Sequence, residues 1–596
     1  MLRTLFHRRH GAARPTRAGR PQPRRGFRPF LEALEDRCVP STLTVTSSAD
    51  DINQPGTLRY DVAHAQSGDT ILLTAAVKSP IVLTHGELLL SQDVTIKSVP
   101  ANTPTISGDG ISRVFEISPG AHVSLMNLNL IDGNGVADNP SGSVGDDGIG
   151  GGILNLGALT LTASTVSGNS AGIYGGGIVN FGAMTLTDST VSGNTASGND
   201  AGIVNFGAMT LTDSTVSGNS AGKAIGGILN LGGTLTLTDS TVSGNSADNY
   251  GGGIVNLYGT LTLTDSTVSG NKAAGNDAGI VNRGTLTLTH STVSGNSASG
   301  NVGGIDSDGT LTLTDSTVSG NSVGGFGAGI VSFGGTLALI DSTVSGNSAS
   351  GNVGGIANFG TATLTDSSVS SNTGYDDGGL FNGGTLTLTD STVSGNSAGN
   401  FAGGINNSGT LTFTDSTVSG NSAGNFGGGG IVNGGTLTLT DSTVSGNKAS
   451  HNIGGGILNF ATLTLTDSIV SGNKASGNGG GIANFSTLTV INCTLSSNSA
   501  GGDGGAIDNT GGGTATVSNS TLSDNTAAHG GALFADFGST LTVTGSSLLD
   551  NTASIDGGAI FNNAGTVNVG TSTFSGNTPD NIVGGFTDLG GNIGLP

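Results

Sequence analysis

The sequence predicts an all-β protein in which a single chain winds into a parallel β-helix of about 25 residues per coil. Close copies of residues 259–271, GTLTLTDSTVSGN, recur from about residue 150 to the C-terminus. The asparagine that ends each copy recurs too, and the sixteen intervals between Asn169 and Asn577 give a mean period of 25.5 residues. Self-similarity at a fixed period in this range is typical of solenoids, so it decides the fold class before any local pattern does.

Four apolar columns run through nearly all copies, represented in one copy by Ile254, Leu261, Leu263 and Val268. Within TLTLT the alternation is strict, so Leu261 and Leu263 share one face of a strand and the threonines share the other. These columns predict a narrow core of aliphatic side chains.

A bend is expected at Asp265, because Val268 lies an odd number of residues after Leu263. Aspartate favours a hydrogen bond from its side chain to the backbone in a turn. The glycines around the strands suit tight corners. We therefore expect three short strands in each coil, at residues 254–256, 260–264 and 267–270.

The recurrent asparagine suits the stacking of coils. Equivalent strands of neighbouring coils lie about 4.8 Å apart, so seventeen coils would form a rod of roughly 80 Å. Asparagines stacked at this spacing can hydrogen-bond along the axis as a ladder. A coil cannot bury its apolar face alone, so we expect stability to be a property of the stack.

The copies GGGIVN…GTLTLTDSTVSGNSA resemble the coils of right-handed parallel β-helix proteins. More narrowly, they resemble the GG-I-x-N repeats of bacterial polymorphic outer-membrane-type proteins and related secreted, adhesin-like proteins. The resemblance covers roughly residues 42–596. It implies the right hand of the coil, which the spacing does not give.

The N-terminal part divides into a leader and irregular coils. Residues 1–41 form a basic leader, expected to be an export signal or a disordered tail; its segment RPFLEALEDRCVPS is similar to a leader motif on large secreted or surface proteins of one bacterial phylum. Residues 42–134 are expected to form an N-terminal cap and irregular coils. Leu58, Val62 and Ala65 at helical spacing predict one short amphipathic helix, and GTLRYDV resembles the segment that caps the first coil of many secreted β-helix proteins.

The remainder of the chain follows the repeat. Residues 135–150 are expected to form a polar loop, residues 151–577 the regular coils and residues 578–596 a C-terminal cap or tail. Most variation in coil length falls between SGN and the next GGI, so loops of differing length should gather along one edge. Binding specificity is most easily placed there.

Composition limits the classes of partner. The formal net charge is −22, and residues 1–40 hold ten arginines against three acidic residues, so the rest of the chain is more acidic still. Such a surface should repel nucleic acid, and no apolar run has the length of a membrane-spanning helix. The two cysteines, Cys38 and Cys493, make no disulfide framework, and Cys493 is expected to be a small packing residue.

Candidate chemistry for glycan cleavage is sparse. Many right-handed β-helices are polysaccharide lyases or hydrolases, which need clustered carboxylates and, for lyases, a basic residue and a metal. The cations that the repeats offer are expected to be solvated surface residues; they are Lys223, Lys272, Arg283, Lys448 and Lys474. We therefore predict no catalytic, cofactor-binding or metal-binding residue.

Two repeated surfaces are further candidates. The bend aspartates form a column that begins at Asp188, is replaced once by His290 and ends at Asp467. Ca²⁺ along this column is an alternative to the expected absence of a cofactor, in which solvent and salt screen the charges. Outward threonine pairs such as Thr262 and Thr264 form flat ranks, interrupted at residues 338–340, that resemble those of ice-binding solenoids but also suit an ordinary exposed sheet.

We expect a non-enzymatic, exported β-helix protein of the cell surface or extracellular matrix, presenting a long repetitive face for adhesion or structural assembly. Extracellular polysaccharide or another cell-surface component is the expected partner. A polysaccharide lyase or glycoside hydrolase on the same fold is the first alternative, and an ice-binding solenoid is the second. A unique charged cluster on one face would favour the enzyme.

Overall fold

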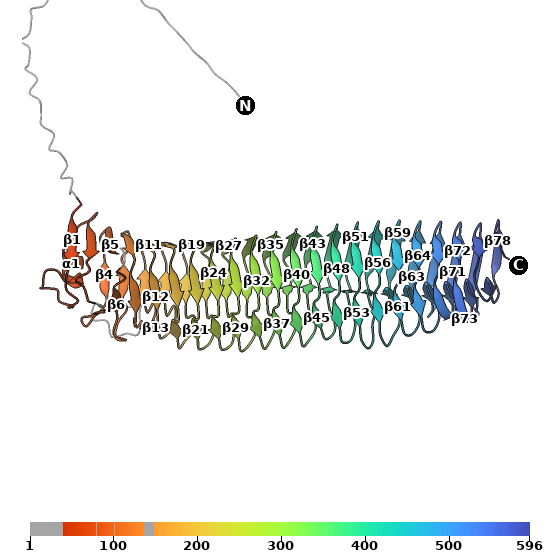
Figure 1. The fold of residues 1–596 in the computed structure, drawn as a ribbon, viewed down its shortest axis with the longest axis horizontal. Coiled ribbons are helices and arrows are strands. Elements are labelled where there is room, and N and C mark those ends of the chain that lie inside the picture. The colour runs from red at the N-terminus through yellow and green to blue at the C-terminus, as the bar shows by residue number, and fades with distance from the viewer. Residues whose placement is uncertain (1–39, 79, 100–101, 136–147, 596) are drawn as a thin grey trace, which may run out of the picture. The chain divides into compact units, whose positions relative to one another are not determined.

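In a computed structural model of the protein, the described residues are 40–78, 80–99, 102–135 and 148–595. They form one parallel β-solenoid whose coils stack along a single axis from β1 to β78 (Figure 1). The longest of its sheets contains 22 strands, and one short helix lies at the N-terminal end. The predicted fold class, an all-β parallel solenoid, is confirmed.

One regular coil contains four strands, each of which pairs in parallel with its equivalents in the neighbouring coils. In the order of the chain they are β26 (Ile254–Leu257), β27 (Thr260–Thr264), β28 (Thr267–Ser269) and β29 (Lys272–Ala273). They belong to sheets that we name C, A, B and D, respectively. Our expectation of three strands per coil is wrong by one, because the strand of sheet D is two residues long and leaves no alternating pattern.

The regular coils run from β10 (Ile153–Asn155) to β76 (Thr573–Ser575) with little change. Every sheet A strand from β11 (Ala158–Thr162) to β75 (Thr566–Gly570) has five residues. The four predicted apolar columns fill the interior: Ile254, Leu261, Leu263 and Val268 are all 0% exposed. Burying one such set per coil gives a continuous core along the axis.

The predicted asparagine ladder is confirmed along the junction between sheets B and D. Asn271 Oδ1 accepts hydrogen bonds from the backbone N–H and from Nδ2 of Asn245, each at 3.0 Å. Its own Nδ2 donates to Asn296 Oδ1 at 2.9 Å and to the Val242 carbonyl at 3.0 Å. The side chain is fully buried, so each coil satisfies polar groups of the next.

Two further ladders were not predicted. At the end of sheet C, Asn230 Nδ2 donates to Asn256 Oδ1 at 2.7 Å, and Asn256 donates in turn to Asn282 at 2.9 Å. At the corner between sheets A and B, Ser266 Oγ accepts from the N–H of Ser240 at 3.1 Å and donates to the Thr264 carbonyl at 2.8 Å.

The corner at Asp265 lies where we predicted it, but its mechanism differs. Asp265 has a φ of 49°, in the left-handed region that aspartate and asparagine tolerate better than most residues. Ser266 makes the buried hydrogen bonds that close the corner. Aspartate therefore suits this corner because it tolerates the left-handed backbone conformation. Serine suits the next position because its hydroxyl makes the buried hydrogen bonds.

The N-terminal helix is α1 (Leu58–His64), in agreement with the prediction. Thr57 caps it, since the Thr57 hydroxyl accepts a hydrogen bond from the Tyr60 N–H at 3.3 Å. Leu58 is fully buried, and Val62 and Ala65 pack against the same core. The helix lies against β1 (Thr42–Val45), β2 (Thr70–Leu73) and β4 (Leu88–Leu90).

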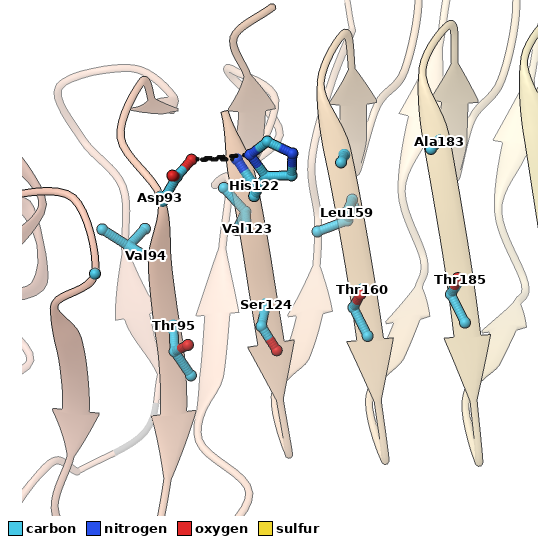
Figure 2. A pocket seen from close by; sticks show the side chains of 12 residues that line it. Asp93, Val94, Thr95, His122, Val123, Ser124, Leu159, Thr160, Ala183 and Thr185 are labelled. Carbon is cyan, nitrogen blue, oxygen red and sulfur yellow. Dashed lines mark hydrogen bonds and ion pairs between the residues drawn. The ribbon is translucent and has the colours of Figure 1, made fainter. Parts of the chain in front are cut away.

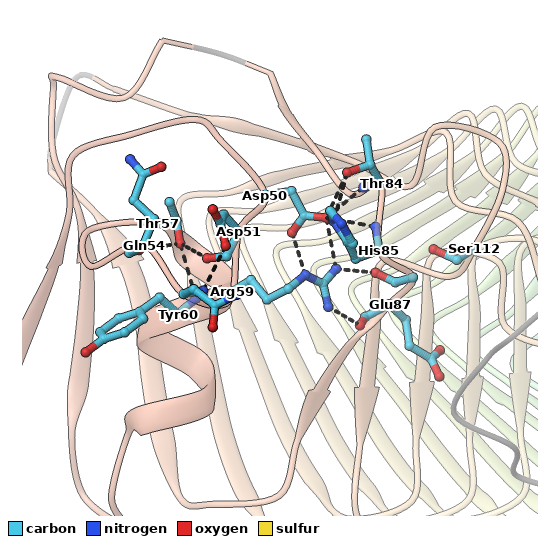
Figure 3. Close-up of polar contacts among 12 residues, drawn as sticks. Asp50, Asp51, Gln54, Thr57, Arg59, Tyr60, Thr84, His85, Glu87 and Ser112 are labelled. Atoms are coloured by element: carbon cyan, nitrogen blue, oxygen red, sulfur yellow. Dashed lines mark hydrogen bonds and ion pairs between the residues drawn. The ribbon is translucent and has the colours of Figure 1, made fainter.

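An arginine clamp fastens this helix to the first coils (Figure 3). Arg59 Nε lies 2.5 Å from Asp50 Oδ1, and Arg59 Nη1 donates to the Glu87 carbonyl at 3.1 Å. The second oxygen of Asp50 accepts the backbone N–H groups of Thr84 and His85 at 2.7 and 2.9 Å. Burial opposes the ionised form of Asp50, but these bonds outweigh it and lower the pKa of the carboxyl.

The irregular N-terminal coils join the same sheets as the regular ones. Their remaining strands are β3 (Ile81–Val82), β5 (Val94–Ser98), β6 (Thr105–Ser107), β7 (Phe115–Ile117), β8 (His122–Met126) and β9 (Asn129–Ile131). At the other end, β77 (Ile582–Val583) pairs with β74 (Ile560–Asn562), and β78 (Thr587–Gly590) pairs with β75. The basic leader up to residue 39 and most of the polar loop lie outside the described residues.

Within the described part of the chain, no helix is both long and apolar enough to cross a membrane.

Candidate functional site

The outward threonines of sheet A form a surface that we name the threonine face. Thr262 pairs in register with Thr236 on one side and Thr287 on the other. Outward threonine pairs continue from Thr160 and Thr162 of β11 through seven consecutive coils. After the interruption in β39 (Thr336–Ile340), they resume for five coils, from β43 (Thr361–Thr365) to β59 (Thr462–Thr466).

A shallow hollow of about 340 Å³ lies at the N-terminal end of the threonine face, across β5, β8, β11 and β15 (Ala183–Thr187) (Figure 2). Four hydroxyl side chains lie along it, one from each strand: Thr95, Ser124, Thr160 and Thr185. Their regular spacing of about 4.8 Å suits hydrogen bonds to an extended polar chain.

The bend aspartates line one edge of the threonine face and are exposed. All of them have a φ between 48° and 50°, and His290 adopts the same conformation in its coil. His290 lies 3.8 Å from Asp265 and 3.6 Å from Asp315. The left-handed backbone conformation at the bend is enough to explain why aspartate recurs there. Ca²⁺ bound along the column stays an untested alternative.

The four lysines that we considered are exposed, as a solvated surface requires. Lys448 and Lys474 are register partners in adjacent coils of sheet D. Among the described residues, no group of three or more His, Cys, Asp or Glu side chains is placed to hold a metal ion.

A second surface, which we name the loop face, lies over the outward side of sheet C. It consists of the outward residues of sheet C and the loops that lead from sheet D to the next coil, such as residues 274–279. The outward residues are buried beneath these loops, as Val179, Val204, Val255 and Val281 show. Isolated parallel bridges join successive loops, for example at Asp277, Val302 and Gly327.

Arg283 belongs to a charged cluster on the loop face, which corrects our expectation of a solvated arginine. Arg283 Nη2 lies 2.6 Å from Asp306 Oδ2, and Nε lies 2.8 Å from Asp308 Oδ2. The Tyr250 hydroxyl lies 3.5 Å from Arg283 Nη2. Burial and the nearby Asp277 raise the pKa of Tyr250 to about 12. Because two carboxylates already neutralise Arg283, it is poorly placed to bind an anionic sugar.

Besides Asp306, four more aspartates are buried on the loop face, and none of them was predicted: Asp200, Asp277, Asp377 and Asp508. Burial raises the pKa of each to about 7. Each also has at least one carboxyl oxygen without a hydrogen-bond partner among the described residues. Comparing copies of the repeat offers a signal, because Asp200 stands where Tyr174 and Ile225 stand in the neighbouring coils.

Cys493 takes the place of a ladder serine. It is buried, its sulfur lies 3.4 Å from the N–H of Ser468, and its own N–H donates to Ser520 Oγ at 3.0 Å. Burial raises the pKa of the thiol. These contacts agree with the expected role of a small packing residue.

No protein-family model matches this chain, and no curated protein matches it in sequence. Among solved structures, a pectate lyase is 12% identical with a TM-score of 0.26 and covers 54% of this chain and 74% of its own. A mannuronic-acid-specific lyase of polysaccharide lyase family 6 from the human gut microbiota is 11% identical, with a TM-score of 0.30, over 67% of this chain and 87% of its own. An alginate lyase of that family is 10% identical, with a TM-score of 0.28, over 93% of this chain and all of its own. At these identities and TM-scores the similarities carry no conclusion about the activity of this chain.

Proposed function

We propose that this chain is a non-enzymatic, exported β-helix protein of the cell surface or extracellular matrix, and that its threonine face contacts extracellular polysaccharide or other cell-surface components. One observation carries the proposal: the same pair of outward hydroxyl side chains recurs in register over seven and then five consecutive coils. Many weak, equivalent contacts along one polymer give an avidity that no single contact provides.

The charge distribution supports binding without cleavage. A lyase acting on uronate polymers needs cations to neutralise the substrate carboxylate. Arg283 is paired with Asp306 and Asp308, and the four repeat lysines are exposed. Because Arg283 belongs to a charged cluster, the enzyme alternative is tested separately, by an assay for product release.

The test uses the full chain and removes hydroxyl groups coil by coil. Both outward threonines are changed to valine in one coil (Thr262 and Thr264), then in three coils and then in six. The matched controls carry the same number of Thr→Val changes on the outward side of sheet B, beginning with Thr267 and Thr292. Retention on a panel of acidic and neutral polysaccharides is measured for each protein.

The proposal predicts that retention falls in steps as more coils are changed, while the sheet B controls bind like the unaltered protein. Complete loss from one coil, or equal retention by the six-coil variant and its control, would contradict a distributed contact.

A further inference from the structure

A cavity of about 440 Å³ lies on the loop face, and phenylalanines from successive coils surround it. Its aromatic lining consists of Phe326, Phe359, Phe381 and Phe401. The ring centroid of Phe359 lies 5.9 Å from that of Phe326 and 5.3 Å from that of Phe381. The volume falls in the range of small-molecule sites, and the lining is largely apolar.

One end of this cavity is acidic. Asp377 lines it and is 3% exposed. Its Oδ2 accepts a hydrogen bond from Asn406 Nδ2 at 3.1 Å, whereas its Oδ1 has no hydrogen-bond partner among the described residues. Asp376 also lines the cavity, and its Oδ1 accepts from Asn400 Nδ2 at 3.0 Å. A buried carboxyl group with an oxygen that lacks a partner costs free energy, and a ligand donor that reaches the carboxyl would recover part of it.

The segment around the cavity cannot supply a cation of its own. Residues 291–447 contain ten aspartates and no lysine, arginine, histidine or glutamate. A positively charged ligand would therefore meet a field of one sign from several coils, with no protein cation competing for Asp377.

We propose that this cavity binds an organic cation, specifically an alkylammonium ion that has an apolar body and at least one N–H. The phenylalanine faces attract the cation and enclose its apolar part. The N–H donates to the carboxylate of Asp377 and forms a charge-assisted hydrogen bond. This binding stands apart from the polymer contact of the threonine face and does not depend on it.

The probe is cyclohexylammonium, titrated into the full chain by calorimetry. Cyclohexanol keeps the apolar body without the charge, and tetramethylammonium keeps the charge without an N–H. We expect cyclohexylammonium to bind best and cyclohexanol to bind at least about tenfold more weakly. Equal binding of the two cyclohexyl compounds, or no saturable binding of the amine up to about 10 mM, would overturn the proposal.

Two variants locate the site. Asp377→Asn preserves shape and should weaken the amine at least about tenfold. Asp366→Asn removes one charge from the exposed bend column in the preceding coil and should change affinity by less than about twofold. Circular dichroism checks that both variants fold. Equal weakening by the two variants would show a general field effect and refute the assigned site.

The pH dependence gives an independent check. Burial raises the pKa of Asp377 to about 7, and Asp376 is the one other titratable group among the lining residues. An aliphatic amine keeps its proton well above this pH. Binding should therefore tighten between pH 5.5 and pH 8.5, and in Asp377→Asn this tightening should be lost. A neutral oligosaccharide that binds here while the amine does not would identify a different ligand class and overturn the proposal.

Discussion

The threonine face and the loop face are built from the same repeat, yet they differ in how much their outward residues change from coil to coil. On the threonine face, one pair of hydroxyl side chains recurs from coil to coil in register. On the loop face, equivalent positions hold valine, aspartate, phenylalanine or asparagine, as at Val331, Asp306, Phe381 and Asn406. The core and the ladders therefore hold the fold, while one outer face repeats and the other diversifies.

The largest effect should come from breaking the asparagine ladder, because both faces depend on it. Asn321 Oδ1 accepts from the backbone N–H and Nδ2 of Asn296 at 3.0 and 2.9 Å. Asn321→Ala leaves these buried donors without partners and should destabilise the adjoining coils by roughly 2–4 kcal/mol. Hydrogen exchange resolved by coil measures the loss locally, which suits a long repeat protein.

The control for this change is Asn301→Ala in an exposed loop, which should alter stability by less than about 0.5 kcal/mol. Equal protection in the two variants would mean that the ladder contributes little.

The next effect concerns pH and belongs to the loop face. The folded pKa of Asp200, Asp277, Asp377 and Asp508 is about 7, well above the ordinary value near 3.9. Between these values the folded state holds protons that the unfolded state releases, so stability falls as the pH rises from about 4 to about 7. Each group should contribute roughly 1–3 kcal/mol of this loss.

Urea unfolding at pH 5 and pH 8 measures the slope. Asp508→Asn should flatten it, whereas Asp366→Asn on the exposed column should leave it unchanged. The groups with lowered pKa, such as Asp50, act in the opposite direction and only below about pH 4. Greater stability at pH 8 than at pH 5 would contradict the buried-carboxyl account.

Completing the interrupted pair of threonines on the threonine face should affect stability less and polysaccharide binding more. Ala338→Thr with Ile340→Thr would join the two runs of threonine pairs; Ile340 is 40% exposed, so the change should shift stability by less than about 0.5 kcal/mol. Retention on any polysaccharide that the protein binds should rise. Unchanged retention would place the contact on another face.

The last effect concerns a single rung of the serine ladder and comes from Cys493→Ser, which restores the ladder serine. A hydroxyl accepts the Ser468 N–H better than sulfur does, so stability should rise by up to about 1 kcal/mol. Thermal unfolding compares this variant with Cys493→Val, which leaves the N–H unpaired and should be less stable than the natural cysteine.

Repetition made most of the fold predictable. The alternation around Leu261 and Leu263 gave the strands and the core, and the period gave the stack and the asparagine ladder. The two-residue strand at Lys272 was too short to leave a pattern. The Ser266 ladder was not predicted, because the side chain of Asp265 was expected to make the hydrogen bond that closes the turn. Arg283 was wrongly expected to be solvated because its partner Asp306 comes from the neighbouring coil, about 25 residues away, which a repeat-by-repeat comparison does not bring together.

We expect this protein to hold polymers without cutting them. The most direct measurement incubates the full chain with acidic and neutral polysaccharides, with and without Ca²⁺, and assays new reducing ends and unsaturated uronates alongside retention in the same samples. We expect retention on at least one polymer and no product. Turnover that Asp277→Asn or Arg283→Gln abolishes would contradict a non-enzymatic rod and make the charged cluster of the loop face a catalytic site.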